Sequence, residues 1–421
     1  MSTKTLEVSC SCGSTNHSFS VPHSSLPLSS HLCNCNISRQ ISGSLLTSYI
    51  NVTHPTASIP QPAKPDTLNL TAYGSSEILR RWFCSTCGTH MYLEYNSDGH
   101  FEAATGTLVL DEGEADDVVR LESCMWIEDT GDGGASVWVK EIGGRVLERW
   151  EGEAGSSPRV PLVQSTTQSI TASQAKGQAL ANTEQEEHDD QAIYAHCHCR
   201  AVEFWITPPD TTSQNASSPF PDLMIPHHLQ HPLSANTSNH PWWLPNSRTR
   251  YLAGTCTCAS CRAASGFDIT FWAFIPTSSI FLTLPSLSNP SPTPFPVSGQ
   301  WGSMRTFHSS PGVTRTFCSV CGANVFWNGG LETHGRRGLV DVAVGLLDAR
   351  SGARAEEILA WWTGRVSFVE DARHQGLAKA LETDLREWGK DREQGDGGGV
   401  AKFDGDVLGV LTEVGGETGG R

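Results

Sequence analysis

The sequence predicts a mainly β protein made of two tandem zinc-binding β domains, which a flexible linker joins and a short C-terminal helix follows. Three observations support this fold class. The cysteine motifs of the first half recur in the same order in the second half. The apolar runs between them are short and rich in β-branched and aromatic residues, as strands are. The 421 residues exceed one ordinary core, and 40 glycines and 23 prolines favour turns over long helices.

The repeat consists of a C-x-C motif, a second C-x-C motif and an F-C-x-x-C-G motif. These motifs begin at Cys10, Cys33 and Phe83 in the first half and at Cys197, Cys256 and Phe317 in the second half. The central motifs, residues 33–43 and 256–266, align without gaps. They differ at the third cysteine, because Ser38 stands where the second half has Cys261. Each half is therefore interpreted as a copy of one unit.

Composition sets the predicted boundaries. A polar stretch with few aromatic residues and an acidic end separates the repeats, and such a stretch cannot bury enough surface to order itself. The predicted segments are a first domain at 5–152, a flexible linker at 153–192, a second domain at 193–372 with loop insertions at about 207–249 and 285–299, and a helix with a Gly-rich tail at 373–421.

The elements inside each unit are predicted from local pattern. Strands are expected at residues 91–95 and 135–142 in the first half and at 201–206, 268–275, 324–327 and 339–347 in the second. A helix is expected at 374–391, because its apolar residues follow helical spacing. These residues are Leu377, Ala378, Leu381, Leu385 and Trp388. We expect this helix to pack against the core rather than to take part in chemistry.

Charge and hydropathy narrow the classes of function. The formal charge is −16 and the basic residues are scattered, which argues against nucleic acid as a partner and against a zinc-finger DNA reader. No apolar run is long enough to cross a membrane, and the N-terminus has no apolar signal segment. Fourteen cysteines without such a signal favour a reducing, cytoplasmic location. A small soluble substrate is the expected partner.

The outer motifs of each unit predict a structural zinc site with four thiolates. Two short cysteine pairs that the fold brings together satisfy tetrahedral zinc. The predicted ligand sets are Cys10, Cys12, Cys84 and Cys87 in the first half and Cys197, Cys199, Cys318 and Cys321 in the second. Disulfides or buried free thiols are the alternative reading of these cysteines.

The central motif of the second half offers three thiolates, Cys256, Cys258 and Cys261. Three protein ligands with an open fourth position are typical of catalytic zinc, which can hold a substrate thiol as a thiolate. A distant histidine that closes a structural site is the alternative. In the first half, Cys33 and Cys35 remain but Ser38 is a poor zinc ligand, so weak or absent metal is expected there. The remaining cysteine, Cys124, is expected to be a small buried side chain.

The series C-x-C, C-x-C-x-x-C-R-x-x-S-G and F-C-x-x-C-G resembles the glutathione-dependent formaldehyde-activating enzyme family, which has an Mss4-like zinc-binding β-fold. The segment "GLLDARSGARAEEI" from Gly345 is similar to the closing segment of that family, and "GTLVLDEGEADDV" from Gly106 is a looser match. The resemblance implies a structural zinc on the outer cysteines and a catalytic zinc on Cys256, Cys258 and Cys261. It also implies that glutathione is the co-substrate.

The function predicted from these observations is that of a zinc-dependent carbon–sulfur lyase. It would add a glutathione-like thiol to formaldehyde or another small aldehyde in the second domain. Arg262 follows the third cysteine, and two roles are open for it: binding of an acidic substrate through a group such as a glutathione carboxylate, or support of the zinc loop through backbone carbonyls. The alternative function is a non-catalytic binding module that zinc stabilises.

Overall fold

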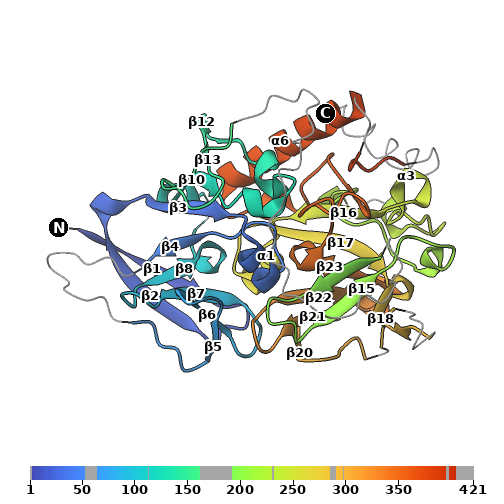
Figure 1. Ribbon diagram of the computed structural model, residues 1–421, viewed down its shortest axis with the longest axis horizontal. Coiled ribbons are helices and arrows are strands. Elements are labelled where there is room, and N and C mark those ends of the chain that lie inside the picture. Colours follow the sequence, from blue (N-terminus) through green and yellow to red (C-terminus); the bar gives the residue numbers. More distant parts are fainter. Residues whose placement is uncertain are drawn as a thin grey trace.

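The computed structural model describes residues 2–52, 64–111, 113–161, 192–229, 232–284, 291–296, 298–394 and 398–403. Within these residues the chain is mostly β, as the sequence predicts. Two units built mainly of strands lie side by side, the first drawn in blue to teal and the second in green to orange (Figure 1).

The first unit contains three small sheets and a hairpin. The first sheet has, in spatial order, β2 (Asn16–Pro22), β1 (Thr3–Ser9) and β9 (Leu108–Val109), and the second has β4 (Tyr49–Asn51), β8 (Phe101–Ala104), β7 (His90–Tyr95), β6 (Leu79–Cys84) and β5 (Leu70–Gly74). The third sheet has β13 (Glu148–Arg149), β10 (Val119–Met125) and β3 (Leu28–Cys33). The hairpin consists of β11 (Glu141–Ile142) and β12 (Arg145–Val146). The sheet of β4 to β8 is antiparallel, whereas β3, β10 and β13 run parallel.

The second unit contains two larger sheets. Their strands, in spatial order, are β19 (Thr293–Pro294), β18 (Ile280–Thr283), β15 (Glu203–Ile206), β14 (Ile193–His196) and β24 (Leu347–Asp348); and β20 (Met304–Ser310), β21 (Val313–Cys318), β22 (Asn324–Gly329), β23 (Leu339–Ala343), β17 (Thr270–Pro276), β16 (Tyr251–Cys256) and β25 (Leu359–Trp361). The order β20-β21-β22-β23-β17 repeats the order β5-β6-β7-β8-β4 of the first unit. The repeat seen in the sequence is therefore a repeat of the fold.

The described helices comprise two that follow the central cysteine motifs and four others. They are α1 (Asn36–Ser42), α2 (Ala115–Val118), α3 (Pro245–Arg248), α4 (Ala259–Ser265), α5 (Leu331–His334) and α6 (Gln375–Gln394). Helices α1 and α4 are equivalent in the two units. Each begins after the second cysteine of a central motif and ends at a glycine in the left-handed region, Gly43 or Gly266, where glycine avoids the Cβ clash.

The two units pack on each other through α1 and α4. Helix α1 of the first unit lies against the 3₁₀ turn Val344–Leu346 of the second, and α4 lies against the 3₁₀ turn Thr105–Thr107 of the first. Two equivalent backbone hydrogen bonds join the units: Gly106 N–H donates to Gly266, and Gly345 N–H donates to Gly43, both at 2.9 Å. The approach is symmetric, so the tandem units form a pseudo-dimer within one chain.

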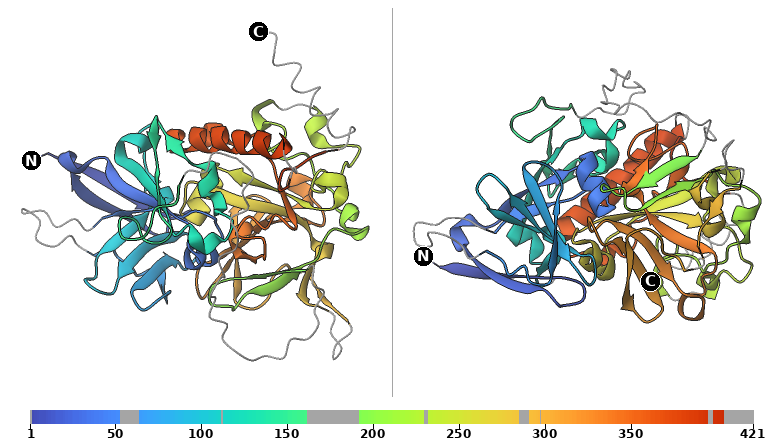
Figure 2. Two further views of the ribbon diagram at one scale, coloured as in Figure 1. Left: turned by 45° about the horizontal axis from the view of Figure 1, so that its top comes forward. Right: turned by 60° about the horizontal axis from the view of Figure 1, so that its bottom comes forward.

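Helix α6 covers both units, as the red helix of Figure 2 shows. The helix predicted at 374–391 is confirmed, and its five predicted apolar residues are buried. Its main partner is the 3₁₀ segment Gly134–Trp138 of the first unit, where the rings of Trp138 and Trp388 meet edge to face at 5.5 Å. The C-terminal helix of the second half thus caps the first half.

The strand predicted at 135–142 is wrong. Residues Gly134–Trp138 form a 3₁₀ helix and only Glu141–Ile142 are a strand. Gly133 and Gly134 take positive φ, which turns the chain so that Trp138 enters the core instead of alternating across a sheet. The other predicted strands coincide with β7, β15, β17, β22 and β23, although β23 ends at Ala343 and a 3₁₀ turn precedes the short β24.

Parts of the predicted linker and tail belong to the folded units. At the start of the linker, Glu151 N–H donates to Pro158 and Val160 N–H donates to Arg149. Residues 162–191, which make up most of the predicted linker, lie outside the described residues. In the tail, Val400 is buried and forms a bridge with Trp361. The remainder of the tail, 404–421, lies outside the described residues as well.

Candidate metal centres and active site

Each unit brings together the four cysteines of its outer motifs. In the first unit, Cys10 and Cys12 lie in the β1–β2 turn, Cys84 ends β6, and Cys87 lies in the β6–β7 turn. Cys12 Sγ is 3.5 Å from Cys10 Sγ and 3.6 Å from Cys84 Sγ. All four Sγ atoms lie within 4.8 Å of one another.

The second unit repeats this cluster. Cys197 and Cys199 lie in the β14–β15 turn, Cys318 ends β21, and Cys321 lies in the β21–β22 turn. Cys199 Sγ is 3.4 Å from Cys197 Sγ and 3.5 Å from Cys318 Sγ. Thiolates about 2.3 Å from a tetrahedral zinc lie about 3.8 Å apart, so both clusters have the size and donor set that zinc requires. All fourteen cysteines are free of disulfide bonds.

The central cluster of the second unit has three thiols. Cys256 ends β16, Cys258 precedes α4, and Cys261 lies in the first turn of α4. Their Sγ atoms lie within 4.8 Å of one another. Cys258 Sγ also accepts a hydrogen bond from the backbone amide of Cys261, at 3.2 Å, so the helix start itself fixes the two thiols relative to each other.

The central cluster opens on a cavity of about 780 Å³. The cavity wall includes the three cysteines, large apolar side chains from β17, and a stretch of the 207–249 insertion. This volume is typical of sites that enclose a small-molecule ligand. The two four-cysteine clusters contribute no residue to this wall among the described residues. Among the described residues, the three-cysteine cluster is thus the one that faces this cavity.

Arg315 on β21 is the charged partner of the central cluster. Its Nη2 donates to Cys261 Sγ at 3.4 Å and to Ser260 Oγ at 3.1 Å, and its Nε donates to Ser309 Oγ at 3.2 Å. Hydrogen bonds from Cys256 and Cys258, together with the Arg315 charge, hold the pKa of the Cys261 thiol far below its usual range. Burial would lower the pKa of Arg315, but the Cys261 thiolate raises it. The cluster therefore favours a thiolate at Cys261.

The first unit shows the same arrangement with one atom changed. Ser38 Oγ lies 3.5 Å from Cys33 Sγ and 3.2 Å from Cys35 Sγ. Arg81, which is equivalent to Arg315, donates from Nη2 to Ser38 Oγ at 3.0 Å and from Nη1 to the Tyr49 hydroxyl at 3.0 Å. A serine hydroxyl is a weak metal ligand beside thiolates, so this pair of cysteines is the poorest metal site of the four.

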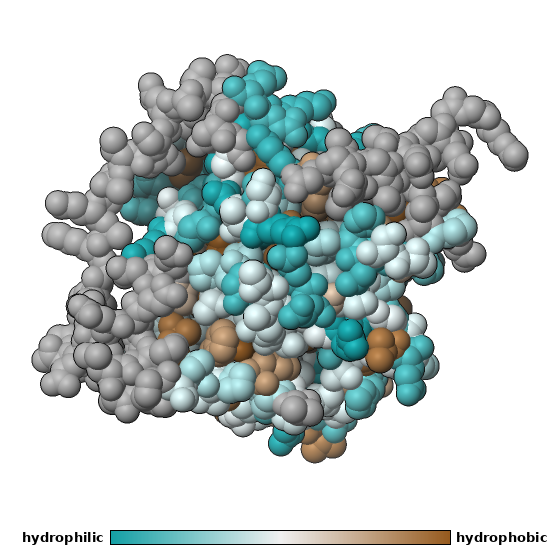
Figure 3. Space-filling view, turned by 90° about the vertical axis from the view of Figure 1, so that its right-hand side faces the viewer, coloured by the Kyte–Doolittle hydropathy of each residue, from teal (hydrophilic) through white to brown (hydrophobic). Residues whose placement is uncertain are grey.

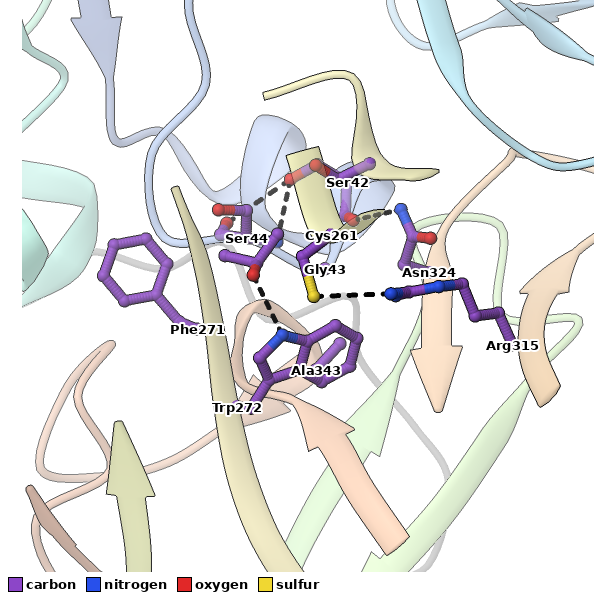
Figure 4. Close-up of a pocket in the computed structure, with 11 residues that line it drawn as sticks. Ser42, Gly43, Ser44, Cys261, Phe271, Trp272, Arg315, Asn324 and Ala343 are labelled. Carbon is purple, nitrogen blue, oxygen red and sulfur yellow. Dashed lines mark hydrogen bonds between the residues drawn. The ribbon is translucent and has the colours of Figure 1, made fainter. Parts of the chain in front are cut away.

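Behind Cys261, a small cavity of about 10 Å³ separates the central cluster from the first unit (Figure 4). Ser42, Gly43 and Ser44 of α1 and its C-terminus line one side of it. Asn324 donates from Nδ2 to the Ser42 carbonyl at 3.1 Å, and Figure 4 shows Cys261 Sγ directed at Arg315. The first unit therefore forms the back wall of the central site of the second.

Arg262 points to the interface between the units. Its Nη1 donates to the carbonyl of Gly106 at 2.7 Å, and the guanidinium is buried. Arg262 is not among the described residues that line either cavity. Of the two roles open to it in the sequence, this contact corresponds to support of a backbone carbonyl, and that carbonyl belongs to the other unit.

Sequence reasoning missed the two arginines at the central clusters. The signal was present, because R-x-F-C stands at Arg81 and Arg315 in both repeats. It also missed the part that the insertion plays: His227 lines the cavity, whereas His228 contacts Glu370 at 3.1 Å. His231 lies outside the described residues. Cys124, expected to be buried, is fully buried.

Comparison with known proteins supports the repeat. A model of the family "Glutathione-dependent formaldehyde-activating enzyme" matches residues 5–126 and again residues 246–365. The second match begins after Cys197 and Cys199, which the structure nevertheless places with Cys318 and Cys321. No curated protein and no solved structure matches the chain. Among the described residues, no helix has the length and apolar character that crossing a membrane requires.

Proposed function

Because the chain belongs to the glutathione-dependent formaldehyde-activating enzyme family, we propose that its second unit is a carbon–sulfur lyase that adds a thiol to a small aldehyde. The observation that carries this proposal is the asymmetry of the clusters. Two clusters have four thiols each, whereas the central cluster of the second unit has three, Cys256, Cys258 and Cys261, and these three line a cavity. Glutathione is the thiol that the family name suggests, and the fourteen free cysteines favour a reducing, cytoplasmic location.

The three thiols of the central cluster fit a zinc ion, which we propose as its cofactor. Bound there, zinc would supply Lewis acidity that lowers the pKa of a thiol at neutral pH. The proposed reaction forms one bond between the thiol sulfur and the aldehyde carbon. The carbonyl π electrons move to oxygen, and the thiol proton ends on that oxygen, so no further reactant is needed.

The protein's own residues would stabilise the negative charge that develops in this step and position the reacting groups. Arg315, buried beside Cys261, places a fixed positive charge next to the reacting region. Such a preorganised cation stabilises negative charge on the aldehyde oxygen more strongly than water does, because it needs no reorganisation. Arg315 and the three cysteines line the same cavity, so a ligand there would meet both the charge and the cluster.

The test uses the first unit as the control for the second. Cys261→Ser gives the second unit the residue that the first already has at Ser38, so the fold should tolerate it. We expect Cys261→Ser to lower the rate of S-hydroxymethyl adduct formation from thiol and formaldehyde by about 100-fold or more and to remove one zinc per chain. The melting temperature should change by only a few degrees.

Cys33→Ser is the matched control, and it should leave turnover within about twofold of the wild type. Equal loss of turnover in Cys33→Ser and Cys261→Ser would contradict the assignment of the second unit as the working one. A wild-type chain that holds only two zinc ions, both inert to added thiol, would favour the non-catalytic binding module.

A further inference from the structure

The cavity over the central cluster exists because the second unit contains an insertion. In the first unit, residues 23–27 connect β2 to β3, whereas in the second unit residues 207–250 connect the equivalent β15 and β16. Neither range matched by the family model includes residues 207–245. The insertion supplies much of the cavity wall, from Ser218 to His227 and again at Trp242.

A buried carboxylate fastens the insertion to the cluster. Asp222 accepts hydrogen bonds from the Phe368 amide at 2.6 Å, from Ser367 Oγ at 3.2 Å and from the His227 amide at 2.6 Å. The same loop holds the cysteine turn, since Thr257 N–H donates to the Ser367 carbonyl at 3.0 Å. The Ser367–Phe368 loop therefore connects the wall to Thr257, the residue between Cys256 and Cys258.

The wall is apolar and aromatic. Large side chains from the insertion and from β17 line it, each less than one-tenth exposed: Phe220, Leu223, Ile225, Trp242, Trp272 and Phe274. The outer face near the insertion is mostly hydrophilic among its coloured residues, with only small separate hydrophobic groups (Figure 3). The apolar residues of the insertion therefore serve the interior of the cavity rather than an external docking surface.

Each of the two carboxylates in the described cavity wall, Asp222 and Asp341, is paired with an arginine. Arg336 donates to Asp341 at 2.6 Å and lies 4.9 Å from the Trp327 ring, and Asp222 pairs with Arg365 at 3.3 Å. Arg315 lies beside Cys261, at 3.4 Å, and its charge belongs to the proposed reaction site. Among the described lining residues, no carboxylate is left to recognise a cationic ligand. The remaining contact area favours an uncharged apolar group.

We propose that this cavity selects an aldehyde with an aromatic or branched apolar substituent, in preference to formaldehyde. The inference rests on the proposed function for the chemistry, but the apolar binding site can be tested without it. Formaldehyde has no substituent and gains nothing from the wall. An aryl aldehyde would bury its ring there while its carbonyl faces Cys261 and Arg315, and this binding energy raises kcat/KM.

The chain provides a matched pair of variants at the cavity rim. Phe368 lines the cavity, and its equivalent in the first unit is Trp126. Both residues have positive φ, 52° and 59°, and both follow a carbonyl that accepts from the residue between the central cysteines, Thr257 or Asn34. Phe368→Ala and Trp126→Ala therefore share the same backbone cost, and only the first removes part of the cavity wall.

The binding test uses benzyl alcohol, which has the ring but no carbonyl, observed by saturation-transfer NMR on the zinc-loaded full chain. We expect Phe368→Ala to weaken its binding by about tenfold and Trp126→Ala to leave it unchanged. Phe368→Leu, which keeps an apolar side chain, should fall between them and serves if the alanine variant does not fold. Absence of binding to the wild type, or equal binding by Phe368→Ala, would overturn the proposal.

The kinetic test compares benzaldehyde with formaldehyde for the same thiol. We expect a higher kcat/KM for benzaldehyde and a benzaldehyde-to-formaldehyde ratio that falls about tenfold in Phe368→Ala. A wild-type preference for formaldehyde would overturn the proposal. If neither aldehyde reacts but benzyl alcohol still binds in a Phe368-dependent way, the proposed function fails and the apolar ligand class of the cavity is supported.

Discussion

At the scale of single residues, Ser38 and Cys261 show how one atom separates two otherwise equivalent sites. Each follows a C-x-C pair, and each receives a hydrogen bond from an arginine two residues before the F-C-x-x-C-G motif. Ser38 Oγ already lies within 3.5 Å of both neighbouring thiols. The first unit therefore keeps the geometry of the cluster and lacks only the third sulfur.

Ser38→Cys should restore that sulfur and raise the zinc content by one ion per chain, because thiolate binds zinc where serine does not. Elemental analysis after purification in zinc measures the change, and Cys261→Ser, expected to lose one ion, is the reciprocal control. Unchanged zinc in Ser38→Cys would show that Arg81 or Tyr49 blocks the site for a reason other than the missing thiol.

The arginines give a second prediction at this scale. Arg315→Gln keeps hydrogen-bond donors but removes the charge beside Cys261, so we expect turnover to fall by about 100-fold, as it does when one charge-stabilising donor is lost from an active site. Arg81→Gln makes the same change in the first unit and should leave turnover within about twofold. Comparable losses in both variants would mean that the arginines support the fold rather than the reaction.

The sequence predicted the cysteine partners in each cluster because motif spacing and zinc chemistry constrain them strongly. The repeated R-x-F-C pattern marks the position of Arg315, but only the fold places its side chain against Cys261. The sequence also left two roles open for Arg262, and its bond to Gly106 requires knowing that the units pack together.

At the scale of elements, α6 shows that a sequence pattern can predict a helix without predicting the structure of the segment that it packs against. Helical spacing of five apolar residues predicts the helix, but local pattern also predicts a strand for the segment that it covers, around Trp138, where the structure has a 3₁₀ helix. Apolar alternation in a short run is compatible with both readings, and only the contact with α6 decides between them. Truncating Trp388, the α6 side chain in this contact, tests how much the contact contributes to the free energy of unfolding.

Trp388→Ala should destabilise the chain by about 3 kcal/mol or more, because it leaves a cavity over the Trp138 ring. Urea unfolding measures the loss, with Leu331→Ala as a control at an exposed residue of the same unit. A loss near zero would mean that α6 is held mainly by its other contacts, such as Asp384 with the Lys140 amide at 2.6 Å.

The start of α6 also carries a pH-dependent contact between the units. His374 Nδ1 lies 2.8 Å from Asp116 of the first unit. Burial lowers the pKa of His374. The Asp116 hydrogen bond and the nearby Asp268 charge together raise this pKa by more than burial lowers it, so the net pKa is above the ordinary histidine value. The same hydrogen bond lowers the pKa of Asp116.

Protonated His374 therefore adds stability that is complete below about pH 6.5 and is lost as the pH rises through the raised pKa. The Asp116 contribution is lost only in acid, as the pH falls through its lowered pKa. We expect the difference in melting temperature between wild type and His374→Gln to shrink from pH 6 to pH 8.5. A constant difference would show that His374 contributes by packing alone.

At the scale of the whole molecule, the two units behave as one body because each completes the other. Helix α1 forms the back wall of the central cluster of the second unit, and α6 of the second unit covers the first. Arg354 of the second unit, itself buried, donates to the carbonyls of Asp132 and Gly134 of the first at 2.7 and 2.8 Å. Repeats in a sequence predict two units, but they carry no signal for this joint packing.

Gly345→Ala tests that packing directly. A Cβ at Gly345 would lie 2.5 Å from the Gly43 carbonyl carbon and 2.6 Å from the Arg39 carbonyl oxygen, and these backbone atoms of the first unit cannot move cheaply. We expect destabilisation by about 2 kcal/mol, typical of overpacking, with a single unfolding transition for both units.

Gly74→Ala is the control, because a Cβ there meets nothing within 4 Å and Gly74 has no positive φ. Urea unfolding should be followed by tryptophan fluorescence and by zinc release, which report on different parts of the chain. Coincident curves that shift together in Gly345→Ala support one cooperative body. Two separate transitions, with only one of them moved, would mean that the units fold independently and that the first does not hold the wall behind Cys261.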